Sequence, residues 1–272
     1  MIMKTLYISD LDGTLLRRDQ TLSEFTVHTI NSLVENGLRF SYATARSIVT
    51  ASAVTMGLKL RLPVIVHNGG FMRRLEDGQI VIGNYFGDEY RYLLEDLMNN
   101  GIFPLVYSMN EGLEKFRYWA EKATPGMRAF LATRQNDPRE LVVHNGECLF
   151  EGQPYYITCV DEPEHLVPFY EKYKDTFHCI LYREIYSGNL FLEFMPKEAS
   201  KANAAVQLKR MLGCDKLVVF GDGKNDLDLF RVADEAYAVE NAEEEIKSLA
   251  TAVIGSNQDD GVARWLAGAF EG

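Results

Sequence analysis

Short apolar runs alternate with stretches of helical periodicity at both ends of the chain. The runs have the length of buried strands, and each leads into a polar or glycine-rich turn: residues 6–9, 38–43, 63–66, 217–220, 236–239 and 252–254. Between them, apolar residues recur at helical spacing, as in residues 23–37, where Ser23 is placed to cap a helix and Gly37 to end it. Strands that alternate with helices predict βαβ units. We therefore expect an α/β fold with a doubly wound parallel sheet.

The middle of the chain has a different pattern of apolar and polar residues. Aromatic-rich apolar runs follow one another closely at residues 102–107, 113–119, 155–160, 178–183 and 190–194, with helical stretches at 89–99 and 164–174. A further helix is expected near residues 127–133. This spacing favours an antiparallel sheet with helices on one face. We therefore predict an inserted α+β domain at residues 84–190, between two parts of a core domain at residues 1–83 and 191–272.

Charge and cysteine usage narrow the class of protein. The 272 residues carry a net charge of −11 and a pI near 5.0. This acidic balance argues against a nucleic-acid binder, which needs a basic face to neutralise phosphates. Phosphorylated small molecules remain compatible with an acidic chain when a divalent cation offsets the repulsion. The four cysteines are scattered without a C-x-x-C pair, which indicates reduced thiols: Cys148, Cys159, Cys179 and Cys214.

No targeting segment is expected. Lys4 is the one charged residue before the first apolar run, and no long apolar stretch with a cleavage site follows it. No run approaches the roughly 18 apolar residues of a membrane span. We therefore predict a cytoplasmic protein with neither a membrane nor a nucleic-acid partner. The sequence leaves the oligomeric state open.

Two acidic residues follow the first predicted strand and precede a Gly-Thr turn. Asp10 and Asp12 point the same way if the backbone stays extended, and a turn at Gly13 would let both carboxylates converge on one site. Such a pair suits a metal site, or a nucleophile beside a general acid. Asp and Gly are also common in ordinary turns. These residues alone therefore do not distinguish a functional site from an ordinary turn.

A second acidic turn follows the strand at residues 217–220. Residues 221–226 read Gly-Asp-Gly-Lys-Asn-Asp, so a buried strand again delivers carboxylates, those of Asp222 and Asp226, to a glycine-rich turn. A phosphate-binding P-loop needs Ser or Thr after the lysine, and Asn225 stands there instead. Ligands of parallel sheets bind at the carboxyl ends of the strands. Two acidic strand ends at that edge predict a shared Mg²⁺ site.

Taken together, the motifs resemble those of the haloacid dehalogenase-like phosphatases, in the Cof-type branch with a large inserted cap. The first motif is Asp10-Leu11-Asp12-Gly13-Thr14, and Thr44 within Ala43-Thr44-Ala45-Arg46 is similar to the second. Lys201 stands in the place of the third motif, and residues 221–226 resemble the fourth. Asn68-Gly69 and Asn257 also match patterns of this branch. The resemblance implies a Rossmann-like core with an α+β cap, and it covers the core and the cap's insertion point.

The resemblance also implies a two-step phosphoryl transfer. Asp10 would attack phosphorus to form an aspartyl-phosphate, and Asp12 would protonate the leaving alcohol and then activate water. Mg²⁺ would be held by the Asp10 carboxylate, the Asp12 carbonyl and the Asp222 carboxylate, with Asp226 acting through water and orienting Lys201. The implied phosphate or substrate ligands are Leu11, Thr44, Ala45, Arg46, Asn68, Lys201 and Asn225. Among these, Arg46 has a simpler interpretation as a cap of the following helix.

Three functions fit these motifs. The leading prediction is an Mg²⁺-dependent phosphatase of small phosphorylated metabolites, with sugar phosphates as the expected substrate class. A phosphotransferase or phosphomutase on sugar phosphates would use the same residues. A non-enzymatic phospho-acceptor also uses Asp, Thr and Lys on a parallel sheet, but it needs no inserted domain. Specificity is expected in the cap, where Arg117, Arg183 and Tyr186 are candidates.

Overall fold

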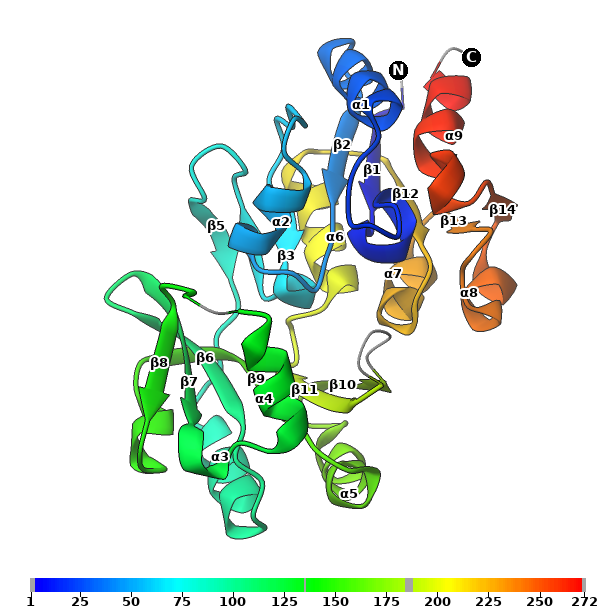
Figure 1. Ribbon diagram of the computed structural model, residues 1–272. Helices are drawn as coiled ribbons and strands as arrows, with labels where there is room; N and C mark the ends of the chain where they lie inside the picture. The colour runs from blue at the N-terminus through cyan, green and yellow to red at the C-terminus, as the bar shows by residue number, and fades with distance from the viewer. Residues whose placement is uncertain (1–2, 135, 184–187, 271–272) are drawn as a thin grey trace. The chain divides into compact units, whose positions relative to one another are not determined.

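The chain folds into two units, shown in the computed structural model of Figure 1, which describes residues 3–134, 136–183 and 188–270. The core unit comprises residues up to Gly83 together with those from Ala199 onward, and the inserted unit runs from Asn84 to Glu198. Each unit has its own sheets and helices. They are described separately below.

Five parallel strands form the sheet of the core unit in the order β14-β13-β12-β1-β2 (Figure 1). They are β1 (Thr5–Ser9), β2 (Arg39–Tyr42), β12 (Lys216–Gly221), β13 (Glu235–Val239) and β14 (Ala252–Ile254). A parallel bridge from Ala43 to Ile65 joins β2 to a small antiparallel sheet. That sheet contains β3 (Val64–Val66), β4 (Phe71–Arg73) and β5 (Ile80–Gly83). The predicted doubly wound α/β core is confirmed.

The strand order creates a topological switch at β1. The chain moves from β1 to β2 on one side and later returns to place β12 on the other side of β1. Helix α1 (Glu24–Glu35) packs against α9 (Gly261–Phe270), and α6 (Lys201–Met211) packs against α7 (Leu227–Val232). Right-handed crossovers in opposite directions put α1 and α6 on opposite faces of the sheet. In such sheets the ligand crevice opens at the switch, at the carboxyl ends of the strands.

Local sequence explains where these helices begin and end. The Ser23 hydroxyl accepts a hydrogen bond from the Thr26 amide and caps α1, as predicted. Gly37 follows this helix with a φ of +100°, a conformation that suits glycine. The remaining core helices are α2 (Ile48–Val54) and α8 (Glu244–Leu249).

A six-stranded sheet forms the centre of the inserted unit, in the order β10-β11-β9-β6-β7-β8. Its strands are β6 (Leu105–Asn110), β7 (Leu113–Trp119), β8 (Glu140–Val143), β9 (Gln153–Val160), β10 (His178–Arg183) and β11 (Leu190–Met195). All neighbours are antiparallel except β7 and β8, which are parallel. The helices are α3 (Tyr90–Asn99), α4 (Pro125–Ala132) and α5 (Pro163–Tyr173). The predicted antiparallel sheet is thus confirmed apart from β8.

Helices cover both faces of this sheet rather than the single face predicted. Leu192 and Phe194 of β11 join the apolar core that α3 and α5 form with the sheet. Phe191 points to the other face, where its ring meets Phe130 of α4 at a centroid distance of 5.4 Å. All six residues of β11 are buried, as a strand covered on both faces requires. The single-face expectation was wrong because the helix expected near residues 127–133 forms α4 and packs on the face opposite to α3 and α5.

The second boundary between the units differs from the predicted one. We expected the core to resume at residue 191, whereas it resumes at Ala199. The segment in question is β11, which pairs with β9 and β10 over most of its length. Its apolar sequence is equally typical of a core strand, so sequence alone placed the boundary too early. The first boundary, after Gly83, coincides with the predicted one.

Two further expectations concern the whole chain. All four cysteines are free thiols. Among the described residues, none of the helices combines the length and the apolar character that crossing a membrane requires.

Candidate active site

Three carboxylates meet where β1 and β12 end side by side. The Asp10 amide donates to the Phe220 carbonyl at 2.9 Å, which continues the ladder between the two strands. Carboxylate oxygens of Asp10, Asp222 and Asp226 all lie within 4.8 Å of one another. Asp10 is 5% exposed and Asp226 is fully buried. The strand order therefore brings together the two acidic turns that lie far apart in the sequence.

Lys201 lies between two of these carboxylates. Its Nζ donates to Asp10 Oδ1 at 2.6 Å and to Asp226 Oδ1 at 2.8 Å, and the side chain is almost wholly buried. Lys201 is the first residue of α6, whose N-cap Ser200 accepts a hydrogen bond from the Asn203 amide at 3.0 Å. A buried lysine needs such partners, because an isolated buried charge is costly.

The negative charge of the cluster exceeds what one lysine compensates. Burial raises the pKa of Asp10 well above its usual range, Lys201 opposes that rise, and the other carboxylates add to it. Burial likewise raises the pKa of Asp222 to about 7, with Asp226 as the next cause. Burial lowers the pKa of Lys201, but Asp10 and Asp226 raise it by more, so it lies above its usual range. The cluster thus favours an additional positive charge.

Gly13 lets the loop after β1 lie directly against Asp222. Its φ is +79°, and a Cβ at this position would lie 2.1 Å from Asp222 Oδ2. The next residue, Thr14, donates its hydroxyl hydrogen to Asp222 Oδ1 at 2.8 Å. No residue with a side chain fits at position 13 without displacing that carboxylate.

A tight turn after β3 supports Lys201 from the other side. His67, Asn68 and Gly69 all have positive φ. A Cβ on Gly69 would lie 2.2 Å from the carbonyl oxygen of Ser200, the residue before Lys201. The Asn68 amide donates to the Thr44 carbonyl at 2.9 Å, which ties this turn to the end of β2. Asn225 Nδ2 also approaches Asn68 Oδ1 at 3.5 Å.

Thr44 is fully buried at the end of β2. Its Oγ1 accepts a hydrogen bond from the Arg46 amide at 3.1 Å, and its hydroxyl hydrogen has no acceptor within the described part of the chain. Leu11 and Ala45, the two implied phosphate ligands with apolar side chains, have no polar side-chain group to offer. The Leu11 side chain is buried, and Ala45 is exposed.

The Asp12 carboxylate is not one of the three that form the cluster, and it pairs with Arg46. Arg46 Nε and Nη2 donate to the two Asp12 carboxylate oxygens at 2.7 and 2.6 Å. Arg46 Nη2 also donates to Gln20 Oε1 at 2.7 Å. The structure therefore brings Arg46 to Asp12, where the sequence had offered a substrate phosphate or a helix cap as its partner.

Several residues that shape the site were missed from sequence. Thr14 binds Asp222 and Gln20 binds Arg46, as described above. Asn241 Nδ2 donates to the Gly13 carbonyl at 2.7 Å, and its Oδ1 accepts from the Asn257 amide at 3.0 Å. Asn257 in turn donates to the Leu16 carbonyl at 2.8 Å. Thr14 belongs to the first motif and Asn257 to the pattern near residue 257, but neither carried a predicted role in the site.

The donor set fits a hard divalent cation. Asp10, Asp222 and Asp226 offer carboxylate oxygens within ligand distance of one another, together with net negative charge. Magnesium prefers oxygen ligands and usually takes one or two carboxylates while keeping several waters. The chain therefore holds a cluster that can bind a metal ion.

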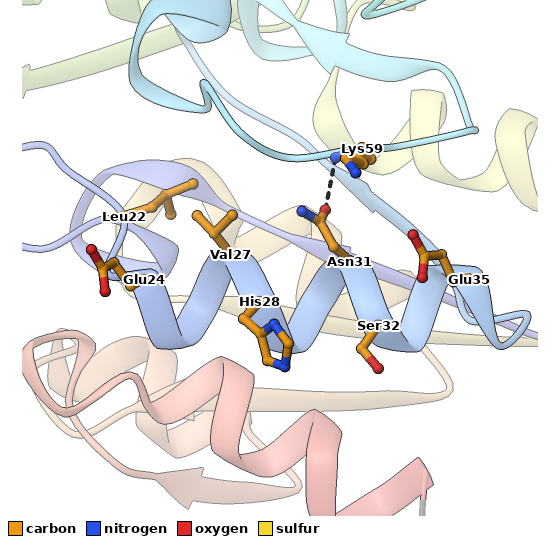
Figure 2. A pocket seen from close by; sticks show the side chains of 8 residues that line it. All are labelled: Leu22, Glu24, Val27, His28, Asn31, Ser32, Glu35 and Lys59. Atoms are coloured by element: carbon orange, nitrogen blue, oxygen red, sulfur yellow. Dashed lines mark hydrogen bonds between the residues drawn. The ribbon is translucent and has the colours of Figure 1, made fainter.

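A separate hollow of about 480 Å³ lies along α1 and shares no residue with the acidic cluster (Figure 2). Figure 2 shows Val27 and His28 of α1 on its wall, with the Lys59 amide donating to Asn31 Oδ1 at 2.8 Å. It is shallow, and its polar groups form no cluster of acids. None of the residues predicted for the site lines it.

A profile of haloacid dehalogenase-like hydrolases matches residues 7–266. The chain belongs to this family. It is 28% identical over 266 residues to a Streptococcus pyogenes protein named as a phosphatase, covering 93% of this chain and 94% of that one. It is 26% identical over 265 residues to a 5-amino-6-(5-phospho-D-ribitylamino)uracil phosphatase of Bacillus subtilis, with 94% of each chain covered.

Solved structures agree on the fold. The crystal structure of a Thermotoga maritima protein has a TM-score of 0.77 and 24% identity, with 97% of each chain covered. A haloacid dehalogenase-like hydrolase from Bacillus subtilis has the same TM-score and 22% identity, covering 96% of this chain and 98% of that one. The predicted family and fold class are confirmed, and the chain is a phosphoric monoester hydrolase.

Proposed function

We propose that this haloacid dehalogenase-like enzyme is an Mg²⁺-dependent phosphatase of small phosphorylated metabolites and that it works through an aspartyl-phosphate on Asp10. The observation that carries this proposal is the placement of Asp10. Its buried carboxylate lies at the switch point of the sheet, bonded to Lys201 and within 4.8 Å of Asp222 and Asp226. A carboxylate there is fixed, desolvated and next to groups that offset the charge of a phosphate.

In the first step, an Asp10 carboxylate oxygen attacks phosphorus while the bond from phosphorus to the leaving oxygen breaks. Asp12 gives its proton to that oxygen, so that an alcohol leaves rather than an alkoxide. In the second step, Asp12 takes a proton from water as the water oxygen attacks phosphorus. The bond from phosphorus to Asp10 then breaks, which releases inorganic phosphate and restores both carboxyl groups.

Three side chains are suited to hold the transferring phosphoryl oxygens. Lys201 supplies a fixed positive charge next to Asp10. Thr44 has a hydroxyl hydrogen to donate, and the Asn225 amide lies near the same strand ends through its approach to Asn68. Fixed donors stabilise the charge that spreads over these oxygens in the transition state. Mg²⁺ bound by Asp10, Asp222 and the Asp12 carbonyl, with Asp226 in support, would polarise the phosphoryl group.

For the substrate we propose a phosphate ester of a sugar or a sugar-like polyol. The Bacillus subtilis relative is named for a phosphate on a ribityl chain, which is such a polyol. We place the selection of the leaving group in the inserted unit, as expected from sequence. Of the candidates there, Arg117 is buried and bonded to Ser108 and Asn110, which suits a structural role. Arg183 is exposed, and Tyr186 lies outside the described residues.

The test is phosphate release from a panel of sugar phosphates, polyol phosphates, nucleotides and pyridoxal phosphate, with Mg²⁺ and after chelation. We expect Asp10→Asn to abolish turnover and to remove a hydroxylamine-sensitive phosphate label. Asp77→Asn, a change at an exposed turn acid, serves as the matched control. Undiminished turnover of the Asp10 variant would contradict the proposal. Isomerisation of a hexose phosphate without free phosphate would favour the phosphomutase instead.

A further inference from the structure

We propose that Arg46, held by Gln20, is a positioning residue that fixes the Asp12 carboxylate for proton transfer, and that it does not serve as a phosphate ligand. This inference rests on the proposed function, in which Asp12 is the acid and base. It gives a role to Arg46, for which the sequence had offered a substrate phosphate or a helix cap, and to Gln20, which had no predicted role.

The need for such a positioning residue follows from the exposure of Asp12. Its side chain is 41% exposed, so packing does not restrict it to one rotamer. The two hydrogen bonds from Arg46 Nε and Nη2 form a planar fork that defines both the position and the plane of the carboxylate. A proton donor must be held in one orientation to reach a reacting oxygen efficiently.

Arg46 is itself well anchored. Its amide donates to Thr44 Oγ1 at 3.1 Å, and its carbonyl accepts from the His67 amide at 2.9 Å. The backbone of Arg46 is therefore tied to the ends of both β2 and β3. Its side chain is 19% exposed, against 41% for the Asp12 side chain that it holds.

Gln20 completes the arrangement from a turn whose conformation is unusual. Its φ is +60°, in the left-handed region that non-glycine residues adopt at a free-energy cost. The turn is closed by hydrogen bonds from the Gln20 amide to the Arg17 carbonyl and from the Arg17 amide to the Thr21 carbonyl. The Arg17 side chain forms an ion pair with Asp260 at 3.0 Å. This strained turn places Gln20 Oε1 against Arg46 Nη2.

The contact is compatible with proton transfer at Asp12. A carboxylate has about four lone-pair positions, and the two Arg46 bonds occupy two of them. Each oxygen thus keeps a lone pair, which can carry the proton that Asp12 gives to the leaving oxygen in the first step and can take a proton from water in the second. A lysine could not replace this function, because an ammonium group offers a point charge rather than a planar fork.

Leaving-group dependence tests the inference. A phosphate ester of an alkyl alcohol needs a proton on its leaving oxygen, whereas 2,4-dinitrophenyl phosphate does not. We expect Asp12→Asn and Arg46→Ala to lower kcat/KM, which reports the first step, about 10²-fold more for an alkyl phosphate than for the aryl ester. The second step is common to both esters, so its slowing should lower kcat for both. Arg46→Lys should resemble Arg46→Ala, and Gln20→Ala should show a smaller loss with the same preference.

A double variant separates action through Asp12 from direct phosphate binding. On the alkyl ester, the Asp12→Asn and Arg46→Ala pair should lose no more activity than Asp12→Asn alone, because both changes disable one group. Arg18→Ala is the matched control, because Arg18 is an exposed arginine in the same turn as Gln20. Thermal unfolding checks that each variant folds.

The outcomes distinguish failure of this inference from failure of the proposed function. If Arg46→Ala raises KM equally for both esters and its loss multiplies with that of Asp12→Asn, Arg46 is a phosphate ligand and the inference is overturned. If Asp12→Asn itself shows no preference between the esters, the assignment of Asp12 as acid and base fails. Gln20→Ala gives the same readout if the Arg46 variants do not fold.

Discussion

The Lys201 ammonium lies 2.6 Å from Asp10 in a position where water has almost no access. Asp10 is the proposed nucleophile, so the same contact concerns both the stability of the fold and the chemistry of the site. Lys201 reaches this position because Ser200 caps α6 and because Gly69 permits the close approach of the Ser200 backbone.

Removing the lysine should therefore affect stability and turnover together. Lys201→Met leaves Asp10 and Asp226 as uncompensated buried carboxylates, which should cost about 3–5 kcal/mol in unfolding free energy. Turnover should fall about 10²–10³-fold, since a donor to the phosphoryl group is lost. Urea denaturation in chelator and steady-state assays measure these effects. Lys209→Met, in the same helix but paired with Asp234 at the surface, should cost at most about 1 kcal/mol.

A methyl group at position 13 should disable the site by contact with Asp222. Gly13→Ala adds a Cβ 2.1 Å from Asp222 Oδ2 and also strains the backbone at φ +79°. Gly78→Ala is the matched control, because Gly78 has φ +68° with nothing within 4 Å of the added Cβ. We expect the control to lose about 1–2 kcal/mol from strain alone and to keep its activity. Equal activity in the two variants would contradict the contact.

Metal binding should stabilise the protein through the acidic cluster. Mg²⁺ added to the chelator-treated enzyme should raise the unfolding temperature with concentration. At a hundredfold excess over Kd, it should add about 2.7 kcal/mol to the free energy of unfolding. Asp222→Asn should remove that response, whereas Asp77→Asn should retain it. Because the change also relieves repulsion among the carboxylates, the metal-free Asp222 variant should be at least as stable as the parent. A full Mg²⁺ response in the Asp222 variant would exclude this carboxylate as a ligand.

Glu193 in the inserted unit should make stability depend on pH. Burial raises the pKa of Glu193 to about 7, although hydrogen bonds from Tyr156 and Tyr182 oppose the rise. The folded state therefore binds an extra proton between the ordinary pKa near 4.5 and pH 7. The stabilisation that comes from this proton is complete below about pH 4.5 and is lost as the pH rises through 7. The free energy of unfolding falls by about 3 kcal/mol over that range.

Glu193→Gln tests that dependence, because the amide stays neutral at every pH. Thermal unfolding of the parent and the variant should be compared between pH 5 and pH 8. We expect the difference in unfolding temperature to shift in favour of the variant as pH rises. Glu171→Gln, at an exposed ion pair with Lys174, is the control and should track the parent. Parallel curves for Glu193→Gln and the parent would show that Glu193 does not titrate in this range.

The meeting of Asp10 and Asp222 could be expected from sequence because it follows from topology. Each acid comes directly after a buried parallel strand, and the carboxyl ends of such strands share an edge of the sheet. Strand order then decides which ends are neighbours, and β1 pairs with β12. No side-chain detail is needed to bring these two residues together.

The contact between Asp12 and Arg46 could not be expected in the same way. It depends on the rotamers of two side chains that are not fully buried and on the left-handed turn at Gln20, which has no sequence signature. The hairpin of β4 and β5 was missed for a related reason, since strands of three and four residues show no clear periodicity. The end of the inserted unit was misplaced because β11 resembles a core strand in composition.

The strand order also has a consequence for how the chain assembles as it is made. β1 and β2 are synthesised before the inserted unit, and β12 is synthesised after it, so Thr5 pairs with Lys216 across the whole insertion. At about 5–20 residues per second, the ribosome needs on the order of ten seconds to cross that gap. The inserted unit is continuous in sequence and has its own apolar core, so it can fold during this interval. Asp10 is thus synthesised before the inserted unit, and the strand that completes its surroundings is synthesised after it.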